Sequence, residues 1–197
     1  MEIDPRHYCV DELLRDGSPI QIRSIRVDDK NLLLEHFSRL SARSVYYRFL
    51  GLRRSLEPAD LARLTELDFV NHVALAATSN RASGEEFIGV GRCIRTHAHR
   101  AEVAFAVLDE YQDRGIGTLL LEHLSIIARA SGITEFEAEV LASNKKMIGV
   151  FVNSGFQVRE SYDAGMVHVA FPIEESGRFL EAHRKRQQAA QDKSGKN

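Results

Sequence analysis

A glutamine and two glycines stand between an apolar run and a leucine-rich run, in the pattern Gln112-x-x-Gly115-x-Gly117. Glycine lets a backbone pass close to a bound group. The leucine-rich run that begins at Thr118 predicts a helix, and the first N–H groups of a helix have no intrahelical acceptors. Such groups bind anions, so the segment predicts a phosphate site. An ordinary glycine-containing turn between a strand and a helix is the alternative.

Two better-known phosphate motifs do not fit these residues. A P-loop requires Gly-Lys-Ser or Gly-Lys-Thr, and the chain has Gly115-Ile116-Gly117-Thr118 instead. A Rossmann fingerprint requires a third glycine, at the position where Leu120 stands. The segment therefore indicates a phosphate-binding loop of another class.

The segments around this loop have the periodicities of alternating strands and helices. In residues 101–108 every second side chain is apolar, and Glu102 lies on the opposite face. Residues 117–130 carry a wide apolar stripe that includes Leu120 and Leu124. The patterns predict strands at 20–27, 72–78, 87–95, 101–108, 134–141, 156–158 and 166–171, and helices at 29–40, 41–50, 58–67, 117–130 and 144–153.

This order of elements predicts a mixed sheet with helices on both faces. The strands at 72–78 and 87–95 should pair as a hairpin, because a short turn cluster separates them. The strand at 101–108, the following helix and the strand at 134–141 should form a right-handed parallel crossover.

The composition is that of a globular protein. At 197 residues, with 44% hydrophobic and 27% charged residues, the chain suits a single domain. A net charge of −2 provides no electrostatic footprint for nucleic acid. The first residues lack the apolar core of a secretory signal, and no apolar run approaches the roughly 18 residues of a membrane span. We therefore expect a cytoplasmic protein with neither a nucleic-acid nor a membrane partner.

Cysteine and histidine spacings indicate no metal site. Cys9 and Cys93 lie far apart in the sequence, which favours two reduced, incidental thiols. His97 and His99 have no cysteine or carboxylate at ligand spacing. We expect these histidines in an exposed turn and no bound metal.

Taken together, the loop and its flanking elements resemble the GNAT superfamily of acyl-CoA N-acyltransferases over residues 20–172. In that superfamily a strand, a pyrophosphate loop, a helix, a strand and an Asn-led helix follow one another as they do here. The resemblance implies an α/β (α+β) GNAT fold: a mixed, mostly antiparallel central sheet of about seven strands, with a splayed parallel pair at its centre and helices on both faces. Residues 1–19 are then an N-terminal extension, and residues 173–197 a polar, basic, helical tail.

Several short segments are more specifically similar to the catalytic domain of Pat-type protein lysine acetyltransferases. They include Ile22-Arg23-Ser24-Ile25-Arg26, His72-Val73-Ala74-Leu75 and Ala101-Glu102-Val103-Ala104-Phe105. Such relatives often carry a fused acyl-CoA-synthetase-like or cyclic-nucleotide-binding module, and we expect neither within these 197 residues. We therefore do not expect the regulation that such modules provide in those relatives.

The resemblance assigns the binding of acetyl-CoA to particular positions. Val107 and Leu108 are implied to offer main-chain hydrogen bonds to the pantetheine arm. Asn144 matches an asparagine that contacts the pantetheine or positions the acyl end, and a helix N-cap is its alternative role. The pyrophosphate is implied to bind the N–H groups of the loop, which are those of Gln112, Asp113, Arg114, Gly115, Ile116, Gly117 and Thr118.

The resemblance also implies a catalytic base. An acceptor lysine with a pKa near 10.4 is neutral in about one molecule in two thousand at pH 7, so a positioned base assists the reaction. Glu102 matches the catalytic glutamate of many protein acetyltransferases in this superfamily, with Glu139 and Glu137 in reserve. A solvated glutamate at a strand edge is the alternative interpretation of Glu102.

One position departs from the superfamily pattern. Many members carry, in the Asn-led helix, a tyrosine that protonates the leaving thiolate, and the matching residue here is Phe151. Because phenylalanine cannot donate a proton, either a water or Ser154 acts, or the thiolate leaves unprotonated, as its pKa of about 8–9 allows. Phe151 is still expected beside the coenzyme, with core packing as its main role.

These implications predict an acetyl-CoA-dependent N-acetyltransferase in which a primary amine attacks directly in a ternary complex, without a metal. A protein lysine is the preferred acceptor, and a small-molecule amine is the alternative. A non-catalytic acyl-CoA-binding module is the competing class, favoured by the missing tyrosine. Both a monomer and a homodimer are compatible with the sequence.

Overall fold

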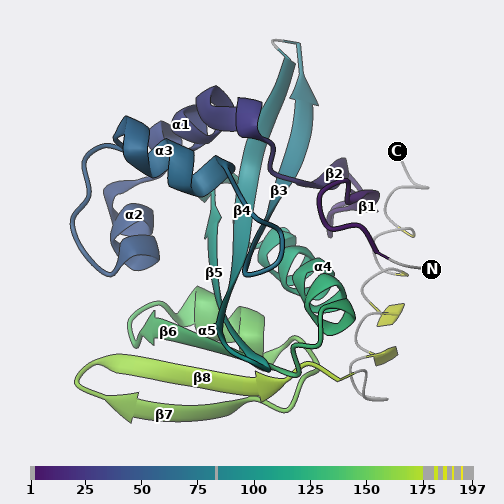
Figure 1. The fold of residues 1–197 in the computed structure, drawn as a ribbon, viewed down its shortest axis with the longest axis vertical. Coiled ribbons are helices and arrows are strands. Elements are labelled where there is room, and N and C mark those ends of the chain that lie inside the picture. Colours follow the sequence, from purple (N-terminus) through teal and green to yellow (C-terminus); the bar gives the residue numbers. More distant parts are fainter. Residues whose placement is uncertain are drawn as a thin grey trace.

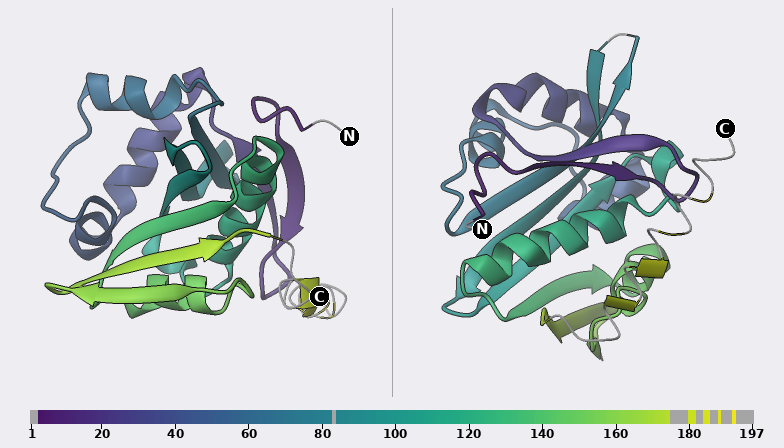
Figure 2. Two further views of the ribbon diagram at one scale, coloured as in Figure 1. Left: turned by 60° about the horizontal axis from the view of Figure 1, so that its bottom comes forward. Right: turned by 90° about the vertical axis from the view of Figure 1, so that its right-hand side faces the viewer.

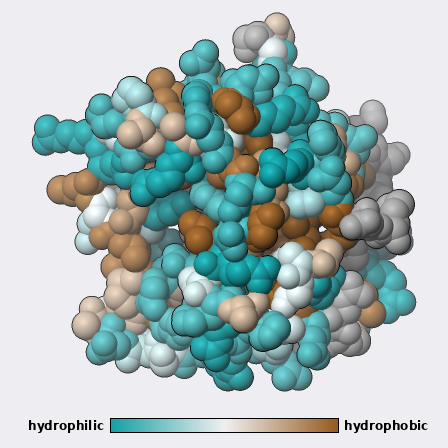
Figure 3. All heavy atoms as spheres, in the orientation of Figure 1, coloured by the Kyte–Doolittle hydropathy of each residue, from teal (hydrophilic) through white to brown (hydrophobic). Residues whose placement is uncertain are grey.

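The computed structural model describes residues 3–82 and 84–174, together with residues 180, 181, 184, 185, 188 and 192. The predicted basic tail at 173–197 therefore lies largely outside the described residues. The described part forms one sheet with helices on both sides (Figure 1). Within it, no helix has the length and apolar character needed to cross a membrane. The face drawn in Figure 3 is mostly hydrophilic, with apolar residues in scattered groups.

The sheet has eight strands in the order β1-β2-β3-β4-β5-β6-β8-β7. β5 and β6 run parallel, and the other neighbours are antiparallel. The predicted mixed sheet is confirmed, with one strand more than expected. The strands are β1 (Cys9–Leu13), β2 (Pro19–Ser24), β3 (His72–Arg81), β4 (Gly84–His97), β5 (Arg100–Val107), β6 (Glu135–Leu141), β7 (Arg159–Asp163) and β8 (Met166–Pro172).

The helices divide between the two faces of the sheet (Figures 1 and 2). One face carries α1 (Lys30–Arg39), α2 (Ala42–Phe49) and α3 (Pro58–Thr65), and the other carries α4 (Ile116–Ala130) and α5 (Lys145–Val152). Short 3₁₀ turns precede α1 (Val27–Asp29) and follow β5 (Asp109–Tyr111). The helix starts follow local signals, since Ser41 caps α2 by accepting from the Ser44 N–H at 3.2 Å.

Each face of the sheet has its own hydrophobic core. Leu120 and Leu124 of α4 pack with Phe105 and other side chains from one face of the sheet. Phe37 of α1 packs with Leu108 and other side chains from the opposite face. Because side chains alternate along a strand, β5 contributes to both cores. Packing on both faces therefore fixes the position of β5.

β5 and β6 pair only at their beginnings. Their register runs from Arg100↔Glu135 to Glu102↔Glu137, although both strands continue well beyond these residues. After Glu102 the two strands separate (Figure 1). The predicted splay of the central parallel pair is thus confirmed, and it leaves the edge of β5 uncovered by β6.

Two local predictions are wrong. Residues 9–13, for which the sequence pattern predicted no element, form the edge strand β1 and pair with β2. Residues 156–158, predicted as a strand, lie in the connection before β7. Phe156 instead stacks on Phe171, with ring centroids 5.4 Å apart, so its apolar character serves the core and not a strand ladder.

Candidate functional site

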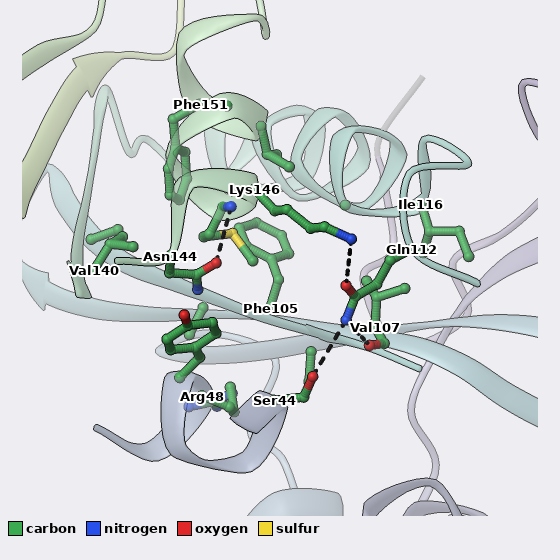
Figure 4. A pocket seen from close by; sticks show the side chains of 18 of the residues that line it. Ser44, Arg48, Phe105, Val107, Gln112, Ile116, Val140, Asn144, Lys146 and Phe151 are labelled. Carbon is green, nitrogen blue, oxygen red and sulfur yellow. Dashed lines mark hydrogen bonds between the residues drawn. The ribbon is translucent and has the colours of Figure 1, made fainter. Parts of the chain in front are cut away.

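The separation of β5 from β6 leaves a cleft of about 740 Å³ (Figure 4). Every residue of β5 from Glu102 to Val107 lines it, so the cleft follows the strand for most of its length. Residues of α2 form one wall, and residues of α5 and the end of β6 form the other. The loop of residues 112–118 closes the end beyond Val107.

The loop of residues 112–118 is folded so that the N–H groups of residues 113–118 remain free, whereas the Gln112 N–H donates to the Asp109 carbonyl at 3.3 Å. Asp113 and Gly115 have positive φ angles of 63° and 97°, and α4 begins at Ile116. The Leu119 N–H donates to the Gly115 carbonyl at 3.0 Å, whereas the N–H groups of residues 113–118 donate to no acceptor in the described part of the chain. Free donors at a helix N-terminus attract anions, so the geometry suits a phosphate.

Gln112 anchors this loop to three other elements (Figure 4). Its Nε2 donates to the Val107 carbonyl of β5 and to Ser44 Oγ of α2, both at 3.3 Å. Its Oε1 accepts from Lys146 Nζ of α5 at 3.1 Å. The glutamine of the motif therefore holds the loop between both walls of the cleft.

Asp109, just before the loop, fastens it to the start of α2. Its carboxylate accepts from the Ser41 N–H and Oγ at 3.1 and 2.9 Å and from Ser44 Oγ at 3.0 Å. Burial acts to raise the pKa of Asp109, but the hydrogen bonds outweigh it and the pKa is lowered. Asp109 is therefore ionised at neutral pH, which keeps these bonds strong.

Glycine at position 117 lets α4 and α5 approach each other. A Cβ at this position would lie 3.2 Å from Val150 Cγ2 of α5, closer than most real contacts. The free N–H groups at the start of α4 and the wall formed by α5 are thus brought to one end of the cleft.

The model of the GNAT acetyltransferase family matches residues 42–156, which include the loop and both walls of the cleft. The chain belongs to the GNAT family. The resemblance stated from the sequence is confirmed, and so is the prediction of an acetyltransferase.

Individual relatives agree with this assignment. The GNAT domain of Streptomyces lividans PAT is 40% identical, with a TM-score of 0.76, and the match covers 83% of this chain and 96% of that domain. Acetyltransferase Pat of Mycolicibacterium smegmatis is 32% identical over 162 residues, which are 81% of this chain and 48% of Pat, so this chain spans about half of that relative. A Salmonella typhimurium protein solved with acetyl-CoA shares the fold, at 17% identity, a TM-score of 0.63 and coverage of 80% and 96%.

The cleft brings together most of the residues that the GNAT resemblance implied. Three of the implied residues, Leu108, Arg114 and Glu137, do not line it. Those that do are Glu102, Glu139, Val107, Gln112, Asp113, Gly115, Ile116, Gly117, Thr118, Asn144 and Phe151.

Leu108 lies outside the cleft, contrary to expectation. The Arg114 side chain also lies outside it, but only the Arg114 N–H was expected to bind the coenzyme. The Leu108 N–H donates to the Ile88 carbonyl at 3.0 Å, its carbonyl accepts from the Tyr111 N–H at 2.8 Å, and its side chain is buried under α1–α3. The Arg114 guanidinium pairs with Asp16 at 2.6 Å. Leu108 thus completes the sheet, and Arg114 holds the β1–β2 connection against the loop while its own N–H stays free.

The three predicted carboxylates have different surroundings. Glu102 lines the cleft and forms no hydrogen bond or ion pair with a described residue. Glu139 also lines it, but its Oε1 lies 2.7 Å from His168 Nδ1. Glu137 accepts from Thr96 Oγ1 at 2.7 Å, outside the cleft. Glu102 is therefore the uncommitted carboxylate of the three.

Asn144 forms the expected N-cap and Phe151 the expected core packing, and both residues line the cleft. Asn144 Oδ1 caps α5 by accepting from the Met147 N–H at 3.3 Å, and the same residue lines the cleft. Phe151 is 1% exposed and packs on Phe105 with ring centroids 6.0 Å apart. Ser154, considered from the sequence as a proton donor, is fully buried, and its Oγ donates to the Phe151 carbonyl at 2.6 Å. It therefore has no access to the cleft.

Sequence reasoning missed Arg15, which lies in the β1–β2 connection. Its N–H donates to the Arg114 carbonyl at 3.0 Å and its Nη1 to the Asp113 carbonyl at 3.4 Å. A Cβ at Gly115 would lie 3.2 Å from Arg15 Cγ, so the arginine lies directly over the loop. The neighbouring residues Asp16-Gly17-Ser18 are typical of a turn, but nothing in them indicates which loop that turn contacts.

Tyr47 and Arg48 of α2 were also missed as site residues, although both line the cleft. The Tyr47 hydroxyl donates to the Ser143 carbonyl at 3.3 Å and accepts from Arg43 Nε at 3.0 Å. It thus reaches from α2 to the connection between β6 and α5. The helical pattern predicted α2, but it did not show that this helix forms a wall of the cleft.

Proposed function

We propose that this GNAT protein transfers an acetyl group from acetyl-CoA to a primary amine by direct attack in a ternary complex. The observation that carries the proposal is the row of free N–H groups at residues 113–118, placed at one end of a cleft that runs along β5 to Glu102. The donors suit a pyrophosphate, and the uncovered edge of β5 suits an extended pantetheine arm. The acyl end then lies toward Glu102.

Glu102 is the proposed general base. Neutralising a lysine ammonium at pH 7 costs about 4–5 kcal/mol from its pKa alone, and a positioned carboxylate that accepts the proton lowers this cost. Glu102 lines the cleft and forms no hydrogen bond or ion pair with a described residue. The neutral amine then attacks the thioester carbonyl, and the thiolate of coenzyme A leaves.

Tyr47 is the proposed donor of a proton to the leaving thiolate. The position at which many GNAT members carry a tyrosine holds Phe151, and Ser154 is committed elsewhere. The Tyr47 phenol enters the same cleft from the opposite wall. A phenol is therefore supplied from α2 instead of α5.

Replacing Tyr47 by phenylalanine should lower kcat about tenfold and leave the Kd for acetyl-CoA nearly unchanged. The expected loss is smaller than the usual contribution of a general acid, about 10²–10⁴-fold, because a thiolate also leaves unprotonated. Stopped-flow or steady-state assays over pH 6–10 measure it, and the alkaline limb of the kcat profile should change in the variant. An unaltered kcat and an unaltered pH profile would exclude this role.

A protein lysine is the proposed acceptor, since the relatives at 32% and 40% identity are Pat proteins. A small amine is the second candidate. Thiol release from acetyl-CoA should be followed with lysine-containing proteins, with short lysine peptides and with small amines. Release that depends on an amine supports a transferase, whereas binding of acetyl-CoA without release on any amine supports a non-catalytic module.

Replacing Arg15 by alanine should raise the Kd for acetyl-CoA about tenfold, because a charge-assisted contact to phosphate is worth roughly 1.5 kcal/mol. Arg15 lines the phosphate end of the cleft and forms no ion pair with a described residue. Isothermal titration with acetyl-CoA and with S-acetyl-pantetheine measures the effect, which should be confined to the phosphate-bearing donor.

Arg54→Ala is the matched control for Arg15, because it removes an equal exposed charge outside the cleft. It should leave the Kd for both donors unchanged. Equal weakening of acetyl-CoA and S-acetyl-pantetheine in the Arg15 variant would show that Arg15 supports the loop and does not bind a phosphate.

A further inference from the structure

Arg92 on β4 is a buried arginine with no carboxylate partner in the part of the chain that the structure describes. Its side chain is 3% exposed. Its Nη1 lies 3.3 Å from His72 Nε2, and its Nη2 has no hydrogen-bond partner in the described part of the chain. Burial and the charge of Arg92 lower the pKa of His72 to about 4, so His72 is neutral at pH 7. It offers Arg92 a lone pair but no negative charge.

Arg23 shows how this chain otherwise buries a guanidinium. It is 1% exposed, and Asp29 and Glu85 pair with it at 2.7 and 2.8 Å. Such pairing is the rule, because an uncompensated buried charge is strongly unfavourable. Arg92 lacks this compensation among the described residues, so it adds uncompensated positive charge to this face of the sheet.

Two further arginines, Arg48 and the exposed Arg63, add to the positive charge around Arg92, although Arg63 pairs with Asp60 at 3.2 Å. Burial and the charges of Arg48 and Arg63 lower the pKa of Arg92 to about 9, so it remains cationic at pH 7. Burial also lowers the pKa of Arg48, against the attraction of Glu102. Arg48 forms no ion pair with a described residue and packs over the Phe49 ring at 5.2 Å. We call Arg48, Arg63 and Arg92 the cationic cluster.

The cationic cluster lies next to the proposed base. Arg92 pairs with Ala104 across the β4–β5 ladder, and Glu102 is two residues before Ala104 on the same face of the sheet. Diagonal neighbours of this kind are about 7–8 Å apart. Arg48 enters the cleft from α2, which packs on this face (Figure 4). A group attached close to an amine at Glu102 is therefore within reach of Arg48.

We infer that the acceptor carries a carboxylate close to its amine, and that Arg48 binds this carboxylate while Arg92 strengthens the positive potential beneath it. The inference rests on the proposed transferase function and adds the class of acceptor. A planar guanidinium matches a carboxylate with two parallel hydrogen bonds. The carboxylate can belong to an acidic residue beside the acceptor lysine of a polypeptide or be the α-carboxylate of a free amino acid, and two substrate pairs distinguish these sources.

The first pair is acetyl-Gly-Asp-Lys-Gly-amide and its Asn counterpart, and the second is Nα-acetyl-lysine and Nα-acetyl-lysinamide. In at least one pair, the wild-type kcat/KM should be about tenfold higher for the substrate with the carboxylate than for its amide counterpart. The preference should shrink as salt rises from 50 to 300 mM. In Arg48→Gln the ratio should fall to about one, whereas Arg54→Gln, outside the cleft, should keep the wild-type ratio.

A ratio near one in both wild-type pairs would overturn the inference, and so would a wild-type ratio retained by Arg48→Gln. Turnover with equal kcat/KM for both members of each pair would still support the proposed transferase function, although it contradicts the inference about the acceptor. If no amine is turned over, calorimetric titration of the two lysine derivatives and two peptides into protein saturated with coenzyme A decides the matter. Weaker binding of the carboxylate members to Arg48→Gln than to wild type supports the inference, and equal binding refutes it.

Discussion

Replacing Glu102 by glutamine is expected to lower kcat by a factor of about 10²–10⁴ and to leave the Kd for acetyl-CoA nearly unchanged. Glutamine keeps the shape of the side chain but cannot accept the proton of the amine. Glu102 lines the cleft near the start of β5, whereas the free N–H groups lie beyond the end of that strand. The variant should therefore lose turnover but keep its affinity for acetyl-CoA. Single-turnover rates and calorimetric titration with acetyl-CoA measure the two quantities.

Glu139→Gln and Glu137→Gln are the matched controls. Glu139 contacts His168 at 2.7 Å and Glu137 accepts from Thr96 at 2.7 Å, whereas Glu102 has no hydrogen-bond partner among the described residues. Both controls should retain kcat within a few-fold of wild type. If Glu102→Gln retains full turnover, Glu102 has no part in the mechanism, and a large loss in Glu139→Gln instead would assign the base to Glu139.

Local signals in the sequence were sufficient to predict the position of the loop of residues 112–118 and the elements around it. Two glycines, an alternating strand before them and an apolar helical stripe after them lie within about thirty residues of one another, and the structure has β5, the loop and α4 in those places. The N-cap role of Asn144 is equally local, since its partner is the N–H of Met147. Such features depend on neighbours along the chain and can be predicted from their pattern.

The rest of the site depends on contacts between distant segments. Arg15 contacts the carbonyl of a residue 98 positions later, and Tyr47 contacts the carbonyl of a residue 96 positions later. Periodicity shows which face of an element is apolar, but it does not show which element its polar face meets. The same limit explains the error at Leu108, whose main-chain groups are taken by Ile88 of β4 and by Tyr111.

β1 was missed for a related reason. Its residues include Cys9, Asp11 and Glu12, and most of its side chains are exposed or half-buried, so no apolar alternation marks it. Its existence depends on the hydrogen-bonding edge that β2 offers.

Replacing Arg23 by alanine is expected to lower the free energy of unfolding by about 3–5 kcal/mol, because it leaves a buried carboxylate without its partner. The side chains of Arg23 and Asp29 are 2% and 5% exposed, and Glu85 is 32% exposed. Burial acts to lower the pKa of Arg23, but the hydrogen bonds to Glu85 and Asp29 outweigh it and raise the pKa. Urea unfolding followed by circular dichroism at pH 7 measures the loss, with Arg26→Ala as an exposed control expected within about 0.5 kcal/mol of wild type.

Because Asp29 and Glu85 differ in exposure, their substitutions should differ in effect. Asp29→Asn should lower the free energy of unfolding more than Glu85→Gln. Water already screens the ion pair of Arg23 with the partly exposed Glu85, so this pair contributes less to stability. In Arg23→Met, adding Asp29→Asn should recover part of the lost stability, since the unpaired buried charge is then removed. A loss below about 1 kcal/mol in Arg23→Ala, or a further loss on adding Asp29→Asn to Arg23→Met, would show that the buried ion pair contributes less to the fold than its burial and geometry indicate.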